Sequence, residues 1–139
     1  MIYVLMQRHS GGMAGNSMLN DAAIKHFPNI HSWFPEEAGC YHPEDLVKAI
    51  KNTVNIYGLR LRAARPFVIL THSLLAIYVL NNLLLEHKDL EIEAYEVISP
   101  DEKVSVIKDR WIDESVLGHV YDDVHNEMNR LIIERKEFK

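Results

Sequence analysis

Short apolar runs separated by longer amphipathic segments mark the predicted elements of this chain. Apolar runs at Ile2–Met6 and at residues 66–71, together with the short and more polar run IHSWF at residues 30–34, predict strands. The last run, PFVILT, is continuously apolar, which is typical of a strand covered on both faces. Two further runs, residues 91–99 and 103–109, alternate in polarity around the turn sequence SPDE, and they predict a hairpin.

Helical periodicity accounts for the longer segments between and after these runs. Helices are expected over residues 18–27, from Pro43 onward with Gly58 ending or interrupting the stripe, over Leu74–Glu86 and over Ser115–Glu137. Strand and helix thus alternate three times before the hairpin and the long last helix. This order predicts an α/β fold, with a mainly parallel sheet flanked by helices, in one domain spanning residues 1–139.

Composition and charge narrow the classes of function. The formal charge of -5 removes the driving force for direct nucleic-acid binding, which comes from neutralising phosphates with Lys and Arg. Cys40 is the only cysteine, so an intramolecular disulfide and a thiolate-rich metal site are excluded, and His26, His31 and His42 match no standard zinc spacing. The first residues lack a signal-peptide pattern, and no apolar run approaches the roughly eighteen residues of a membrane span. We therefore expect a cytoplasmic protein with neither membrane nor metal binding.

One histidine stands at a telling position in the apolar run ILTHSLLAIYVL. His72, flanked by the hydroxyls of Thr71 and Ser73, lies where a predicted strand passes into a predicted helix. It belongs either to an ordinary N-capping turn or to a site at the carboxyl end of a strand, where open α/β sheets bind ligands. The residues alone leave both interpretations open.

Three motifs follow one another in an informative order. Residues 10–12 (SGG) precede a helix, residues 35–43 (PEEAGCYHP) follow a strand, and residues 71–73 (THS) end the next strand. Their order and spacing resemble the second half of an ABC-type ATPase head of the OLD-like and SMC-like kind. Those families combine a signature SGG, an acidic DEPEAGLHP and a strand ending in THS. The hairpin and long acidic last helix are also similar, so the resemblance covers nearly the whole chain.

The resemblance assigns chemistry to two of these positions. Glu36 takes the place of the catalytic glutamate, which polarises the attacking water, and His72 takes the place of the switch histidine, which contacts the γ-phosphate of ATP. In such ATPases, hydrolysis is accelerated mainly by positioning the attacking water and by stabilising the charge that develops on the phosphate.

Five further residues fall on positions that face the opposite subunit in the resembling heads. Ser10, Gly11 and Gly12 match the signature, whose backbone N–H groups meet nucleotide held by the other subunit. His42 and Pro43 match a loop that faces the partner in the dimer. The resemblance therefore implies that the chain retains the surface by which such heads pair.

Two departures from the family pattern change the expected activity. No G-x-x-x-x-G-K-[ST] segment occurs, so no loop is present to cradle the phosphates of ATP. Pro35 stands where the family keeps an aspartate that orders Mg²⁺, and a proline side chain supplies no oxygen ligand. We expect no cofactor on the chain alone, and ATP with Mg²⁺ only in a composite site completed by a partner.

The resulting hypothesis is a degenerate ATPase lobe that works through association. Its expected partner is a complete ABC-type ATPase or the missing N-terminal lobe, which it would regulate or inhibit as a decoy, in the manner of a phage or mobile-element accessory factor. Hydrolysis is expected only when a partner completes the site.

Two alternatives of other classes stay open. The start MIYVLMQRHSGG resembles histidine phosphatases, in which Arg8 would neutralise phosphate oxygens, His9 would attack phosphorus and His72 would be the second histidine. The segment between them lacks that family's second arginine motif. A plain α/β scaffold that forms a homo-oligomer through the Ser115–Glu137 helix is the other alternative.

Overall fold

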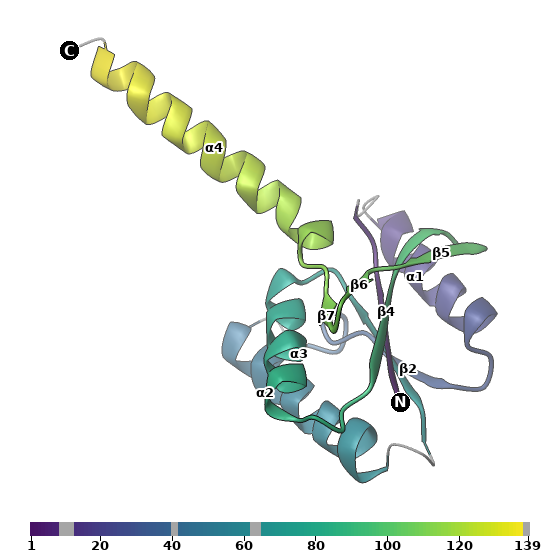
Figure 1. Cartoon of the computed structure of the whole chain (residues 1–139). Coiled ribbons are helices and arrows are strands. Elements are labelled where there is room, and N and C mark those ends of the chain that lie inside the picture. The colour runs from purple at the N-terminus through teal and green to yellow at the C-terminus, as the bar shows by residue number, and fades with distance from the viewer. Residues whose placement is uncertain (9–12, 40–41, 62–64, 138–139) are drawn as a thin grey trace.

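A five-stranded sheet forms the centre of the computed structural model, which describes residues 1–8, 13–39, 42–61 and 65–137 (Figure 1). The strand order is β2-β3-β1-β4-β5, and the first four strands in this order run parallel while β5 is antiparallel to β4. The predicted α/β class with a mainly parallel sheet is confirmed. The strands are β1 (Ile2–Met6), β2 (His31–Trp33), β3 (Phe67–Thr71), β4 (Ile92–Ser99) and β5 (Glu102–Ser105).

The first strand of the chain lies in the middle of this sheet. β1 pairs with β3 on one side and with β4 on the other, so that Leu5 lies opposite both Leu70 and Tyr95. β1 and β3 are apolar and buried on both faces, as their unbroken sequences predict. β2 is short and its His31 and Ser32 are exposed, which suits an edge strand.

Helices cover both faces of the sheet (Figure 1). On one face α1 (Met13–His26) packs Leu19 and Ala22 against apolar side chains of β1 and β3. On the other face α2 (Pro43–Thr53) and α3 (Leu74–Glu86) enclose the larger core cluster. The boundaries predicted for α3 are confirmed because its start and end coincide with changes in sequence pattern.

The helix from Pro43 changes its winding instead of stopping at Gly58. After Thr53 it continues as the π-helix η1 (Val54–Arg60), and Gly58 lies buried inside this segment. A Cβ atom at Gly58 would lie 2.8 Å from Leu90 Cδ1 and 3.2 Å from Ile2 Cγ1. The glycine therefore allows η1 to approach the start of β1 closely.

The predicted hairpin is present, but its second arm is shorter than the sequence pattern indicated. β5 ends at Ser105, and β6 (Ile107–Lys108) pairs with β7 (Trp111–Ile112) in a separate two-stranded sheet. Asp109, in the turn between β6 and β7, has a left-handed backbone with φ 61°. Aspartate tolerates this conformation better than most residues, so a turn forms here without glycine.

The last helix, α4 (Ser115–Glu137), leaves the body of the molecule (Figure 1). Asp113 Oδ1 accepts the Ser115 N–H at 3.0 Å, and Val116 and Leu117 are buried beside the body. Every residue from 120 to 136 is exposed. Within the described ranges, no helix combines the length and apolar character that crossing a membrane would require.

Asn81 joins α3 to the segment that carries α4. Its Oδ1 accepts the Ile112 N–H at 2.9 Å and its Nδ2 donates to the Ile112 carbonyl at 3.0 Å. Asn81→Ala leaves the N–H and the carbonyl of the buried Ile112 without these hydrogen-bond partners. We therefore expect the substitution to lower the free energy of unfolding by about 2 to 4 kcal/mol. The neighbouring Asn82 is exposed, and Asn82→Ala is the matched control. Equal urea midpoints for the two variants would contradict this role of Asn81.

Candidate functional site

The carboxyl ends of β1 and β3 form a topological switch point. The two strands are neighbours, yet the chain leaves β1 toward α1 on one face and leaves β3 toward α3 on the other. In open α/β sheets, ligands bind in the crevice that such diverging connections create. Polar side chains gather at this edge from four segments: Gln7, Arg8, Glu36, Thr71, His72 and Glu96.

Glu36 holds this edge together from the turn that follows β2. Its Oε1 accepts a hydrogen bond from the Thr71 hydroxyl and another from the His72 backbone N–H at 3.2 Å. The Thr71 oxygen in turn accepts the Ser73 N–H at 3.0 Å. One carboxylate oxygen thus fixes the junction between β3 and α3.

His72 lies at this carboxyl edge and does not cap α3. The N-cap of α3 is Ser73, whose hydroxyl accepts the Ala76 N–H at 3.4 Å. The His72 ring packs against Phe34 with centroids 5.5 Å apart. Burial lowers the pKa of His72 below 6.5, and the charge of Glu36, a hydrogen bond with the Gln7 backbone and the charge of Glu37 oppose that shift. Capping of α3 therefore does not account for His72, and the ligand-site interpretation stays a prediction.

Arg8 borders the crevice on the side of β4. Its Nε lies 3.2 Å from Glu96 Oε2 and its guanidinium donates to Glu96 Oε1 at 3.3 Å, which is a two-point pairing. Glu96 is in register with Met6 at the end of β1. The cation that a phosphatase mechanism would need is therefore already paired with a carboxylate of its own chain.

The remaining predicted residues divide into two groups. His42 is the N-cap of α2, with its Nδ1 accepting the Glu44 N–H at 3.1 Å, and Pro43 occupies the first turn, where proline is favoured. Capping alone explains this pair of residues. Ser10, Gly11 and Gly12 lie outside the described residues, as does His9, in the connection between β1 and α1.

Three members of the cluster, Gln7, Thr71 and Glu96, are not among the residues selected from sequence. Thr71 stands out in the sequence only as a hydroxyl beside His72, although this hydroxyl donates the hydrogen bond to Glu36. Glu96 was not singled out at all. Its signal was a carboxylate in the middle of a predicted strand, which indicates a nearby charged partner when the strand is internal to a sheet.

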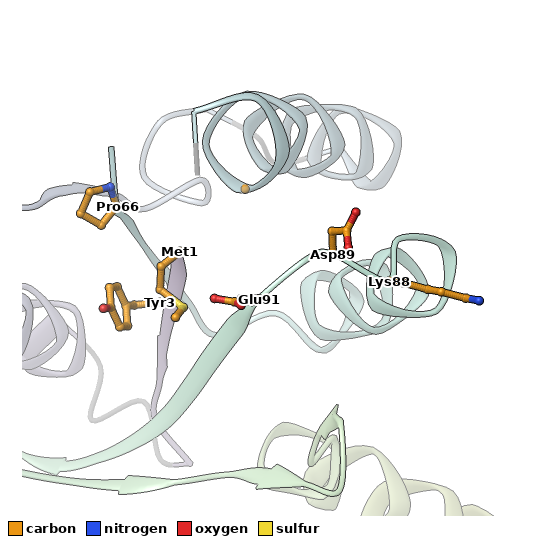
Figure 2. Close-up of a pocket in the computed structure, with 7 residues that line it drawn as sticks. Met1, Tyr3, Pro66, Lys88, Asp89 and Glu91 are labelled. Carbon is orange, nitrogen blue, oxygen red and sulfur yellow. The ribbon is translucent and has the colours of Figure 1, made fainter. Parts of the chain in front are cut away.

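A second hollow, at the amino ends of the strands, lacks comparable chemistry. Met1, Tyr3 and Pro66 line it, and its charged residues are exposed, with Lys88 pointing away from the other labelled side chains (Figure 2). In the parts of the chain that the structure describes, no three His, Cys, Asp or Glu side chains are grouped to hold a metal ion. The carboxyl edge is therefore the better candidate site.

Comparison with known proteins returns no matching family model, curated protein or solved structure. Function consequently has to be argued from the chemistry of the carboxyl edge and from the surfaces around it.

The lowered pKa of His72 gives a signed prediction for pH dependence. Protonation of His72 costs more in the folded protein than in the unfolded chain, so its titration lowers the free energy of unfolding as the pH falls below 6.5 and makes no such contribution at higher pH. His72→Gln removes the titration while keeping a polar side chain. We expect the free energy of unfolding of the variant to decline less than that of the parent between about pH 7 and about pH 5. Parallel pH profiles in urea titrations would contradict the assignment.

Proposed function

We propose that this chain is a lobe related to the second half of an ABC-type ATPase head, which acts in the cytoplasm by associating with a complete ATPase. On its own it does not hydrolyse ATP. The observation that carries the proposal is the contact of Glu36 with Thr71 and His72 at the carboxyl edge of the sheet. The glutamate and the histidine come from motifs 36 residues apart, and the resemblance requires them to share one site.

The way Glu36 is used supports association over independent catalysis. Its Oε1 is occupied by the β3–α3 junction, and its Oε2 is buried without a hydrogen-bond partner among the described residues. A carboxylate that activates water needs an oxygen within reach of that water. In this chain the residue braces the edge that would meet a partner.

The carboxyl edge also lacks the groups that would bind phosphate. The sequence contains no phosphate-loop lysine, Pro35 supplies no ligand for Mg²⁺, and Arg8 is paired with Glu96. The nucleotide would have to be held by the partner. A lobe that keeps the pairing edge but cannot bind nucleotide alone can complete a partner's site or block it as a decoy. Either role suits a small accessory factor of a phage or mobile element.

Co-elution and turnover test the proposal directly. Mixed with ABC-type ATPases from the same genome and with ATP, the chain is expected to co-elute with one of them and to change its rate of hydrolysis. Glu36→Ala and His72→Ala should weaken both effects, with circular dichroism confirming that the variants fold. Glu91 is exposed near the opposite edge, so Glu91→Ala is the matched control. Unchanged elution and turnover across these ATPases would contradict the proposal.

A further inference from the structure

α4 carries an apolar stripe that nothing in the described chain covers. Val124, Met128 and Leu131 are exposed by 60%, 47% and 49% of their surfaces. Val120, Tyr121 and Ile132 are exposed beside them. Among the described residues, seven of the thirteen exposed large hydrophobic side chains belong to this one helix. So many exposed large hydrophobic side chains on one projecting helix indicate a binding face.

The spacing of the stripe specifies the kind of partner. Leu117, Tyr121, Val124, Met128 and Leu131 follow one another in steps of four, three, four and three residues, which is the spacing of a coiled-coil seam. A shallow hollow runs along the same face between Val124 and Arg135, where side chains of another helix can insert. An amphipathic helix that leaves its body gains most of its stability from such packing.

We propose that the partner is a second copy of this chain, and that two α4 helices pair in antiparallel orientation. The seam defines the register. Val124 packs on Met128 of the second copy and Tyr121 packs on Leu131 of the second copy, because both pairs are centred on Asn126.

The distribution of charge favours the antiparallel orientation, because a parallel pair would bring the aspartates of the two first halves together. Asp122 and Asp123 give the first half of α4 two negative charges, whereas Arg130, Arg135 and Lys136 balance three glutamates in the second half. Asp123 and Arg130 are two turns apart on the same flank of the seam, and they are centred between Asn126 and Glu127. The apolar register therefore brings Asp123 level with Arg130 of the second copy, twice by symmetry.

Two further features of α4 favour the antiparallel orientation over a parallel one. Arg130 donates to Glu134 Oε1 of its own helix at 2.8 Å, so in the antiparallel pair it would bridge Glu134 and Asp123 of the second copy. In a parallel, in-register pair Arg135, which lines the seam, would face Arg135 of the second copy. Like charges would then meet in the seam near the carboxyl end of the two helices.

Mass and cross-linking of the full chain test this proposal independently of the ATPase association. Light scattering is expected to give twice the 16.1 kDa mass of one chain. Leu131→Lys should give a monomer with an unchanged thermal transition of the body, because Leu131 is exposed on the projecting helix. In a Cys40→Ser background, mixed Val124→Cys and Met128→Cys chains should form the mixed disulfide, and Asn126→Cys on the outward face should not cross-link.

Charge exchange tests the register. Asp123→Arg and Arg130→Glu are each expected to raise the dimer dissociation constant about tenfold, since two attractive pairs become repulsive. Arg130→Glu also removes the pair with Glu134 of its own helix, so the double variant should bind more tightly than either single variant without reaching the parent value. A monomeric mass at every concentration would overturn the proposal, and so would disulfides between identical positions. A dimer that persists in Leu131→Lys would overturn it as well. Loss of ATPase association with the dimer intact would count against the proposed function alone.

Discussion

The position of β1 determines where chemistry can occur in this protein. A strand buried on both faces and bonded on both sides has to come from an unbroken apolar sequence, and Ile2–Met6 provides one. Because its neighbour β3 leads to the opposite face of the sheet, the connections after these two strands diverge, and open α/β sheets bind ligands at such points. The contacts of Glu36 with Thr71 and His72, and of Arg8 with Glu96, lie at this carboxyl edge.

Within the crevice, acidic side chains compensate groups of the same chain. Glu36 accepts hydrogen bonds from the Thr71 hydroxyl and the His72 backbone N–H, and Glu96 forms an ion pair with Arg8. Two side-chain oxygens of this cluster, Gln7 Oε1 and Glu36 Oε2, are buried without a hydrogen-bond partner among the described residues, but its cation is already paired with a carboxylate. The site therefore differs from one in which an unpaired cation is available to bind phosphate. This distribution of partners is the physical basis for proposing association instead of independent hydrolysis.

The parts of the fold that follow from local pattern could be predicted, and the parts that depend on tertiary contacts could not. β1, β3, α3 and α4 are each bounded by abrupt changes in polarity or periodicity, so their predicted limits agree with the structure. The winding of η1 depends on the close approach of Gly58 to Leu90 and Ile2. The separation of β6 from β5 depends on a turn without glycine and on the bonds from Asn81 to Ile112.

The candidate site shows the same division. A glutamate after one strand and a histidine after the next could be selected from sequence because both fall at strand ends. Their hydrogen-bonded contact, and the choice of Ser73 over His72 as the helix cap, needed the structure because both depend on distances of a few ångströms between separate segments.

Amide hydrogen exchange of the full chain with its partner ATPase and nucleotide tests the central claim most directly. The account predicts slower exchange in residues 33–39 and 71–75, since these segments form the carboxyl edge, while exchange at residues 88–92 on the amino edge stays the same. Protection confined to the amino edge or to α4 would contradict the account, and so would protection of the carboxyl edge by ATP alone.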